Sequence, residues 1–300
     1  MGALIGIDWG TTRLRGYLID RAGGVVEARE APHGLRALPP GGFPAALAAL
    51  SAGWPERLPV LMAGMVGART GWREASYLDG TAGGVTADDL ARALAPVDAP
   101  GRLLIVPGVR IDRDGTPDVM RGEETQAVGA GLDRVRVLLM PGSHSKWLRV
   151  GAGRIGGLRT AMTGEVFAAL AAHTILADTI AGEDGDMAGF DDGLAAALRL
   201  ARPGALLDAL FSIRARVLCG TLDAGAARGF LSGLLIGAEV ASAPEHGPVE
   251  IVATPALARH YALALATPGR DATIAPGDCA ARGLWTIARA AGLVTGDDRC

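Results

Sequence analysis

The chain has 300 residues, of which 49% are hydrophobic and 20% are charged, and its formal net charge at pH 7 is −3. This length and apolar content suffice for a large buried core, arranged in one large or two medium domains. So small a net charge gives neither the basic field that binds nucleic acid nor a polybasic anchor for a membrane surface. We therefore expect a globular protein with no nucleic-acid and no membrane partner.

The cysteines are Cys219, Cys279 and Cys300, an odd number at wide spacing. This pattern argues against a disulfide framework and favours a cytoplasmic protein. The longest apolar run, residues 230–243, is interrupted by Glu239 and is too short to span a bilayer. We expect a cytoplasmic location, and the sequence leaves open whether the chain forms a homo-oligomer.

The first predicted element is a β-hairpin in residues 4–18, where an apolar strand ends at Asp8 and the chain turns through Gly10. Backbone N–H groups at such a turn can approach phosphate oxygens, because Gly10 has no side chain and Thr11 and Thr12 add hydroxyl donors. Asp8, at the end of a buried strand, can hold a metal-bound water. The pattern favours a phosphate-binding hairpin over an ordinary hairpin with one acidic residue.

The rest of the first half combines short strands with helices. Strands first, followed by strands that alternate with helices, indicate an α/β domain. We expect strands at residues 25–29, 60–64 and 103–106, with a glycine loop after the second of these, and helices at residues 45–51 and 123–132.

Near residue 138 the pattern restarts. Residues 138–150 again read as strand, glycine turn and strand, followed by a strand at 155–162 and a helix at 165–177. The turn at Gly142 and Ser143 resembles the first turn in carrying hydroxyl donors. This weak duplication of topology predicts a first domain over residues 1–137 and a second over residues 138–300.

The remaining predicted elements alternate in type. We expect Asp278 to be the N-cap of the last helix. In chain order, the elements are a strand at 217–221, a helix at 230–242, a strand at 249–253, a helix at 256–266, a strand at 273–275 and a helix at 278–291.

Two acidic residues, Glu123 and Glu124, follow a strand-like segment and open a helix. A carboxylate there could accept the proton of a substrate hydroxyl, with Glu124 as the first candidate and Glu123 as the second. The alternative is that both only compensate the helix dipole.

The second hairpin carries Lys146, the only lysine of the chain, and His144. We expect Lys146 to contact phosphate or substrate rather than to be a solvated surface lysine. His144 could contact phosphate or bind a carbonyl of its own turn. No Gly-x-x-x-x-Gly-Lys-Ser/Thr sequence occurs, which excludes a P-loop kinase.

Six blocks of sequence together resemble the 2-dehydro-3-deoxygalactonokinase family, and the resemblance runs over nearly the whole chain. They are residues 7–12 (IDWGTT), 62–67 (MAGMVG), 120–126 (MRGEETQ), 141–147 (PGSHSKW), 162–165 (MTGE) and 231–240 (LSGLLIGAEV). The resemblance implies an α/β fold of the actin-like kinases, with two ribonuclease H-like domains facing each other across a cleft. It places the sugar acid on the side of residues 1–137 and the nucleotide on the side of residues 138–300.

The activity that the resemblance implies is ATP-dependent phosphorylation of the terminal hydroxyl of 2-dehydro-3-deoxy-D-galactonate to the 6-phosphate. Such phosphoryl transfer needs a magnesium ion, donors to the transferred group and a carboxylate base. The alternatives are a kinase of the same fold acting on 2-dehydro-3-deoxygluconate or a hexose, and an actin-like nucleotide switch without metabolic activity.

The resemblance also implies roles for particular residues. Asp8 would be catalytic and would hold the metal, beside the base at Glu124 or Glu123. A substrate carboxylate calls for an arginine or a backbone nest. Nucleotide and phosphate contacts are expected from Gly10, Thr11, Thr12, Gly142, Ser143, His144, Lys146, Gly220, Thr221 and Thr254, and substrate contacts from Arg13, Arg15, Arg69, Arg121, Thr163 and Glu165.

Overall fold

The computed structural model describes residues 2–99, 101–180, 187–200, 205–244 and 247–294. The chain divides into two compact units. Unit 1 comprises residues 1–135, 148–158 and 276–300, and unit 2 comprises residues 136–147 and 159–275. Two later segments of the chain thus belong to unit 1. Within the described ranges, no helix has the length and apolar character needed to cross a membrane.

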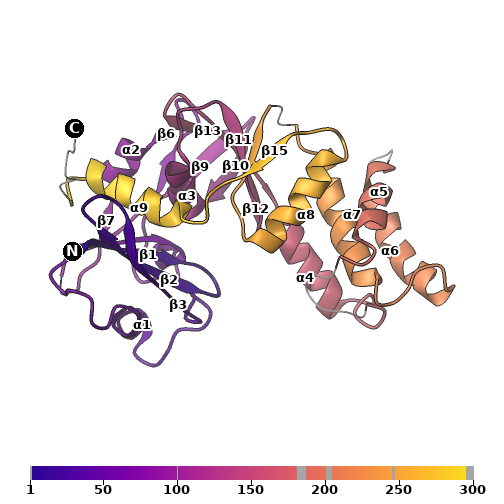
Figure 1. The fold of residues 1–300 in the computed structure, drawn as a ribbon, viewed down its shortest axis with the longest axis horizontal. Coiled ribbons are helices and arrows are strands. Elements are labelled where there is room, and N and C mark those ends of the chain that lie inside the picture. The colour runs from indigo at the N-terminus through magenta and orange to yellow at the C-terminus, as the bar shows by residue number, and fades with distance from the viewer. Residues whose placement is uncertain (1, 100, 181–186, 201–204, 245–246, 295–300) are drawn as a thin grey trace. The chain divides into compact units, whose positions relative to one another are not determined.

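The main sheet of unit 1 has the strand order β3-β2-β1-β4-β8-β7. The β1–β2–β3 meander is antiparallel (Figure 1). Strand β4 runs parallel to β1, and β8 runs parallel to β4. The strands are β1 (Gly2–Trp9), β2 (Leu14–Asp20), β3 (Val25–Ala31), β4 (Val60–Gly64), β7 (Ala95–Pro96) and β8 (Leu103–Ile105).

Strand β1 is covered on both faces. Its odd residues Ile5, Ile7 and Trp9 share a buried cluster with α1 (Gly42–Leu50). Gly6 points the other way, because a Cβ there would lie 3.1 Å from Leu284 of α9 (Cys279–Ala290). Side chains alternate between the faces of a strand, so Asp8 lies on the Gly6 face.

Helices α3 (Glu123–Ala130) and α9 pack closely at two glycines. A Cβ on Gly129 would lie 1.8 Å from the carbonyl oxygen of Cys279, and one on Gly283 would lie 1.8 Å from that of Thr125. These contacts involve backbone, which cannot move aside as a flexible side chain can. The position of α3, and of the two glutamates at its start, therefore depends on this close approach.

We expect Gly283→Ala to lower the free energy of unfolding by about 3 kcal/mol, because the added methyl overlaps a backbone carbonyl. Gly277→Ala is the matched control, since no atom lies within 4 Å of its Cβ position. Urea unfolding of both variants measures the difference. Equal free energies of unfolding of the two variants would show that α3 and α9 can move apart at little cost in free energy.

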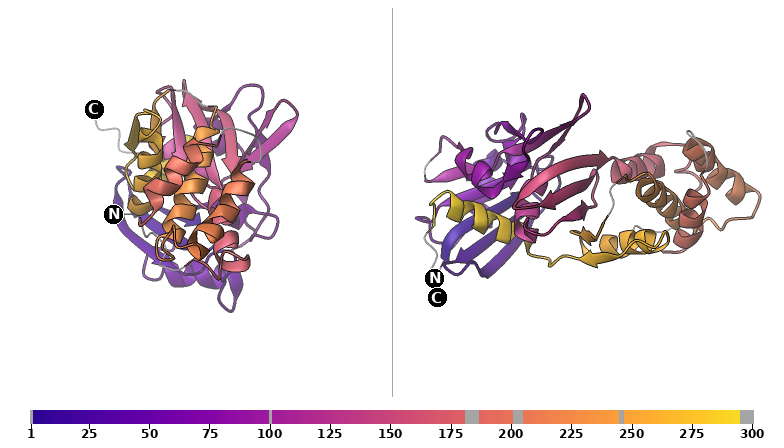
Figure 2. Two further views of the ribbon diagram at one scale, coloured as in Figure 1. Left: turned by 90° about the vertical axis from the view of Figure 1, so that its right-hand side faces the viewer. Right: turned by 90° about the horizontal axis from the view of Figure 1, so that it is seen from above.

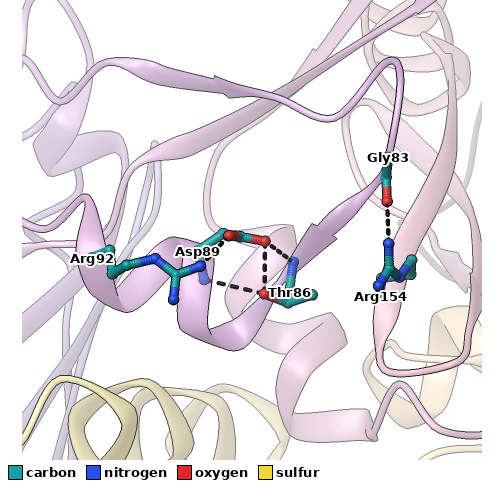
Figure 3. A network of polar contacts seen from close by, with 5 residues as sticks. All are labelled: Gly83, Thr86, Asp89, Arg92 and Arg154. Carbon is teal, nitrogen blue, oxygen red and sulfur yellow. Dashed lines mark hydrogen bonds and ion pairs between the residues drawn. The ribbon is translucent and has the colours of Figure 1, made fainter.

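Unit 1 also contains a three-stranded sheet of order β10-β9-β5. The sequence predicted only the strand-like segment before Glu123, which lies in β10, and it predicted neither β5 and β9 nor the short β6 and α2. In Figure 3 the side chain of Thr86 accepts the Asp89 N–H (3.1 Å) and Asp89 accepts the Thr86 N–H (3.0 Å), a capping box that starts α2. These elements are β5 (Tyr77–Asp79), β6 (Val85–Thr86), α2 (Ala87–Arg92), β9 (Gly108–Arg113) and β10 (Thr116–Met120).

A second contact in Figure 3 fixes the segment before β6. Arg154 donates to the carbonyl oxygen of Gly83 at 2.7 Å, from the strand that pairs with β6. That strand, β13 (Arg154–Ala161), and β12 (Ser145–Gly151) contribute residues to both units.

In unit 2, β14 (Val249–Ile251) pairs in parallel with β11 (Arg136–Met140) and β15 (Ala272–Ile274). Helix α7 (Ala227–Ala241) contacts each of the other helices of this unit. Figure 2 shows the fold in two further views. The others are α4 (Thr163–His173), α5 (Phe190–Leu198), α6 (Ala205–Leu218) and α8 (Pro255–Ala266).

Most predicted elements are confirmed within a few residues, including the β-hairpins at both expected positions. The strand expected at 217–221 is wrong, because Val217 and Leu218 end α6 and the following residues form a turn. The short apolar run at Val217 has strand propensity, but the packing of a 14-residue helix that buries Ile213 determines its conformation. Of the cysteines in the described ranges, Cys219 is exposed and Cys279 is buried.

Candidate active site

Asp8 lies at the carboxyl end of β1, where the charges of Arg15 and Glu123 act on its carboxyl group. Its Oδ2 is 3.8 Å from Nη1 of Arg15, its cross-strand neighbour, and its side chain is 14% exposed. Burial raises the pKa of Asp8 to about 6; the Arg15 charge opposes this rise and the Glu123 charge adds to it. The ionised carboxyl is thus incompletely compensated, which favours an additional cation beside it.

The two adjacent glutamates of α3 have different surroundings. Glu124 is fully buried, its two carboxyl oxygens accept the Gly122 N–H at 2.9 and 2.7 Å, and it accepts the Thr125 hydroxyl at 3.1 Å. Glu123 is partly exposed and accepts the Arg121 N–H at 3.0 Å. Of the pair, Glu123 is the accessible carboxylate and the one whose charge acts on Asp8.

The buried Glu124 makes stability depend on pH. Burial, and then the Glu123 charge, raise its pKa from 4.5 to about 7. The folded state therefore binds more protons than the unfolded state between these values, so the free energy of unfolding should fall as pH rises through this range. The full difference corresponds to about 3 kcal/mol.

We expect Glu124→Gln to flatten this dependence, because a carboxamide keeps an acceptor for the Gly122 N–H but does not titrate. Urea unfolding of both proteins between pH 5 and pH 8 measures the slope. If the free energy of unfolding of the variant falls with pH as steeply as that of the wild type, titratable groups other than Glu124 cause the pH dependence.

Two glycines bring the loops around Asp8 together. Gly64 ends β4 with φ 90°, and a Cβ there would lie 2.5 Å from the carbonyl oxygen of Trp9. Gly122 precedes α3 with φ 108°, and its Cβ position is 3.2 Å from the Gly64 Cα. Only glycine accommodates both the contacts and the positive φ. The carboxyl ends of parallel β1 and β4 thus meet the start of α3, an arrangement typical of ligand sites in α/β proteins.

The first hairpin turn is held by backbone hydrogen bonds. The Gly10 N–H donates to the Arg13 carbonyl (2.8 Å), and the carbonyls of Gly10 and Thr11 accept from Leu35 and Arg36 (both 3.1 Å). The Gly10 amide is therefore engaged within the turn. The exposed Thr12 and partly exposed Thr11 remain at the surface of unit 1.

Of the four candidate arginines, two pair with a carboxylate of the sheet. Arg13 and Arg15 both bind Glu30 on β3, Arg15 at 3.3 Å. Arg69 is exposed. Each of these three guanidinium groups is thus either in an ion pair or at the surface.

Arg121 differs from them. It donates to the Ala75 carbonyl at 2.7 Å, and its guanidinium carbon lies 4.3 Å from the centre of the Tyr77 ring. Its Nε and Nη1 are buried and have no hydrogen-bond partner among the described residues. Buried donors of a charged group almost always have a partner, so this cation is the candidate for an anion that the chain itself does not supply.

In unit 2 the second hairpin turn packs on the start of α4. The Glu165 N–H donates to the Ser143 carbonyl (2.9 Å), and a Cβ on Gly164 would lie 2.3 Å from the Gly142 oxygen. His144 Nε2 and Glu165 Oε2 are 2.5 Å apart on the surface. The exposed turn at Gly142 and Ser143 thus meets the amino end of a helix, a position that suits anions.

Lys146 is buried rather than solvated. It is 7% exposed, and its Nζ donates to Thr160 Oγ1 at 2.9 Å, from β12 to β13. The alternative that Lys146 is a solvated surface lysine is therefore wrong.

A buried carboxylate, Glu239 of α7, binds together the elements around the second turn. It accepts the Tyr261 hydroxyl at 2.6 Å and the Trp147 indole N–H at 2.7 Å. The Tyr261 hydroxyl donates its hydrogen bond to Glu239, so Ser145, 2.9 Å away, donates to the Tyr261 oxygen. Sequence reasoning noted Glu239 only as an interruption of an apolar run; that isolated charge in an apolar helix was the available signal.

Next to this network, α4, α7 and α8 enclose a cavity of about 620 Å³. Gly142, Thr163 and Thr254, all candidates from the sequence, line it. Gly220 and Thr221 do not: both are exposed after α6, and Thr221 bonds to the Arg216 carbonyl. The volume lies within the range of small-molecule sites.

The described part of the chain contains no cluster of three or more His, Cys, Asp or Glu side chains placed to hold a metal ion. Magnesium does not require one, because it is usually bound through one or two carboxylates, water and substrate phosphates. Asp8, with water and substrate phosphates, fits that smaller donor set.

Comparison with known proteins identifies the chain's relatives. The model of the 2-keto-3-deoxy-galactonokinase family matches residues 8–287. A protein of Rhizobium meliloti (strain 1021) assigned as 2-dehydro-3-deoxygalactonokinase DgoK1 is 38% identical, covering 96% of this chain and 97% of the relative. The 2-dehydro-3-deoxygalactonokinase of Escherichia coli (strain K12) is 36% identical, covering 95% and 97%.

Solved structures agree. A Sinorhizobium meliloti protein assigned as a 2-dehydro-3-deoxygalactonokinase has a TM-score of 0.84 at 33% identity, covering 96% of this chain and 98% of the other. Component A of (R)-2-hydroxyglutaryl-CoA dehydratase from Acidaminococcus fermentans, at 13% identity and a TM-score of 0.50 with coverage of 96% and 98%, shares the fold alone. The α/β fold with ribonuclease H-like domains of the actin-like kinases is confirmed. The chain therefore belongs to the 2-keto-3-deoxy-galactonokinase family.

Proposed function

We propose that the chain is a kinase that transfers a phosphoryl group from ATP to the terminal hydroxyl of 2-dehydro-3-deoxy-D-galactonate, giving the 6-phosphate. The observation that carries this proposal is the identity of 36–38% to relatives of that name along almost their entire length. The carboxylates at the end of β1 and the cavity of unit 2 are consistent with the two substrates.

Unit 1 supplies the residues for the sugar acid and the proton. Glu123, partly exposed at the start of α3, takes the proton of the hydroxyl as it attacks. Asp8 would hold a magnesium ion, which when bound neutralises negative charge on the phosphates. Its partly compensated carboxyl and the neighbouring Glu123 support that role.

The carboxylate of the sugar acid is assigned to Arg121. Its two buried donors lack protein partners among the described residues, and guanidinium groups bind carboxylates with charge-assisted hydrogen bonds. Arg13 and Arg15 are already paired with Glu30. Arg121 also adjoins the start of α3, so it would orient the substrate near Glu123.

Unit 2 supplies the residues for the nucleotide. The apolar cavity accepts the nucleoside, and the turn at Gly142 and Ser143 with the start of α4 accepts phosphate. Lys146 contributes a positive charge from the same hairpin, and Thr254 lines the cavity at the start of α8.

A coupled assay of ADP release tests the proposal. The purified chain is incubated with ATP and magnesium and with 2-dehydro-3-deoxygalactonate, its gluconate-derived epimer, galactonate, gluconate or glucose. We expect the highest kcat/KM with 2-dehydro-3-deoxygalactonate. Preference for the epimer or for glucose would mean that this compound is the substrate instead. Nucleotide binding without phosphorylation of any of these compounds would indicate the actin-like switch.

A further inference from the structure

The cavity of unit 2 extends along α4. Its lining begins at Thr163 and Gly164 and continues to Ala171 and Ala172. At 1.5 Å per residue this is a length of about 14 Å along the helix. The end at Thr163 lies beside the turn that accepts phosphate, so the apolar remainder of the cavity is the place for a nucleoside.

One part of the wall carries an aromatic ring and a guanidinium group beside each other. Phe167 of α4 and Arg228 of α7 both line the cavity, and the Arg228 guanidinium carbon lies 5.2 Å from the centre of the Phe167 ring. Phenyl rings and guanidinium planes are the surfaces on which nucleobases stack, and this stacking does not depend on the identity of the base. Selectivity among bases therefore needs a polar group elsewhere in the wall.

His260 of α8 provides such a group. It lines the cavity, is 7% exposed, and its ring packs 4.8 Å from that of Phe190. Its Nε2 has no hydrogen-bond partner among the described residues. Burial, and then the charge of Arg259, lower the pKa of His260, so the ring is neutral at pH 7 and has one donor and one acceptor nitrogen.

We propose that His260 determines nucleotide specificity by hydrogen bonding, through Nε2, to the edge of a purine base that stacks on Phe167 and Arg228. This inference rests on the proposed function, because it requires a nucleotide in the cavity. A purine suits the site better than a pyrimidine, since a bicyclic base covers more of the apolar wall.

The test compares His260→Leu with His260→Gln and with the control His173→Leu, a change at the exposed end of α4 outside the cavity lining. Loss of one hydrogen bond in a buried site should raise the KM for ATP about tenfold in His260→Leu. The preference for ATP over GTP and CTP should shrink, while the KM for the sugar acid stays unchanged. Glutamine, which keeps a donor and an acceptor, should restore most of the affinity.

A direct readout accompanies the kinetics. Titration of each folded variant with a fluorescent ATP analogue, after a thermal melt, separates weak binding from misfolding. Wild-type affinity and base preference in His260→Leu would overturn the assignment, as would equal losses in His173→Leu. Failure of the wild type to bind any nucleotide would instead contradict the proposed function.

Discussion

Asp8→Asn is expected to lower kcat about 10³-fold, a loss of the size seen when a preorganised charge is removed from a transition state. Asparagine has the size of aspartate and should keep the packing at the end of β1, but it cannot supply the negative charge that holds a cation beside the phosphates. The KM for the sugar acid should change little, because Arg121 rather than Asp8 is assigned to the substrate carboxylate.

The same substitution should not weaken the fold. Burial raises the pKa of Asp8 to about 6, so its ionised form costs stability above that pH. Asparagine removes this cost, and urea unfolding near pH 8 should show equal or greater stability. Loss of activity without loss of stability is the pattern of a functional residue. Asp20→Asn, at the end of β2, serves as the control, and near wild-type turnover of Asp8→Asn with magnesium present would contradict the role.

The sequence predicted the two hairpins well, because glycine followed by Thr or Ser after an apolar strand determines a turn locally. Gly10 and Gly142 both lie at these turns. The pattern did not show that the Gly10 N–H is already bonded to Arg13. That bond depends on the conformation of the turn, which propensity alone does not specify.

The cavity could not be predicted, since its walls come from helices far apart in the chain. Phe167, Arg228 and His260 belong to three different helices, and no spacing in the sequence relates them. Glu239 is a similar case, because its partners Trp147 and Tyr261 lie on a strand and on another helix. Tertiary packing creates such sites, and the sequence shows only the isolated polar residue.

The choice between Glu123 and Glu124 also required the structure. Adjacent residues of a helix point about 100° apart, so only one of the two can face a ligand well, and the pattern does not say which. The structure places Glu124 in the core, bonded to the Gly122 N–H, and leaves Glu123 partly exposed near Asp8. We therefore assign the base to Glu123 and not to Glu124, the first candidate from the sequence.

Glu123→Gln should accordingly lower kcat by about 10² to 10⁴, the usual contribution of a general base, while ATP binding remains as in the wild type. Glutamine still accepts the Arg121 N–H through its carbonyl oxygen, so the start of α3 should stay in place. The pH profile of kcat should lose the ionisation that Glu123 contributes and keep that of Asp8, whose pKa is about 6 and whose charge is still needed. Glu124→Gln is the matched comparison at the neighbouring position and should retain most of the activity.

Turnover, nucleotide affinity and unfolding of both variants distinguish the possible outcomes. A stable Glu124→Gln that has lost turnover would return the role to Glu124 and would require its carboxyl to leave the core during the reaction. Full activity in both variants would mean that neither glutamate accepts the proton. Loss of turnover in Glu123→Gln with an unchanged pH profile would assign Glu123 to positioning of Asp8, since a residue that only orients another carboxyl does not add a titration of its own to the rate.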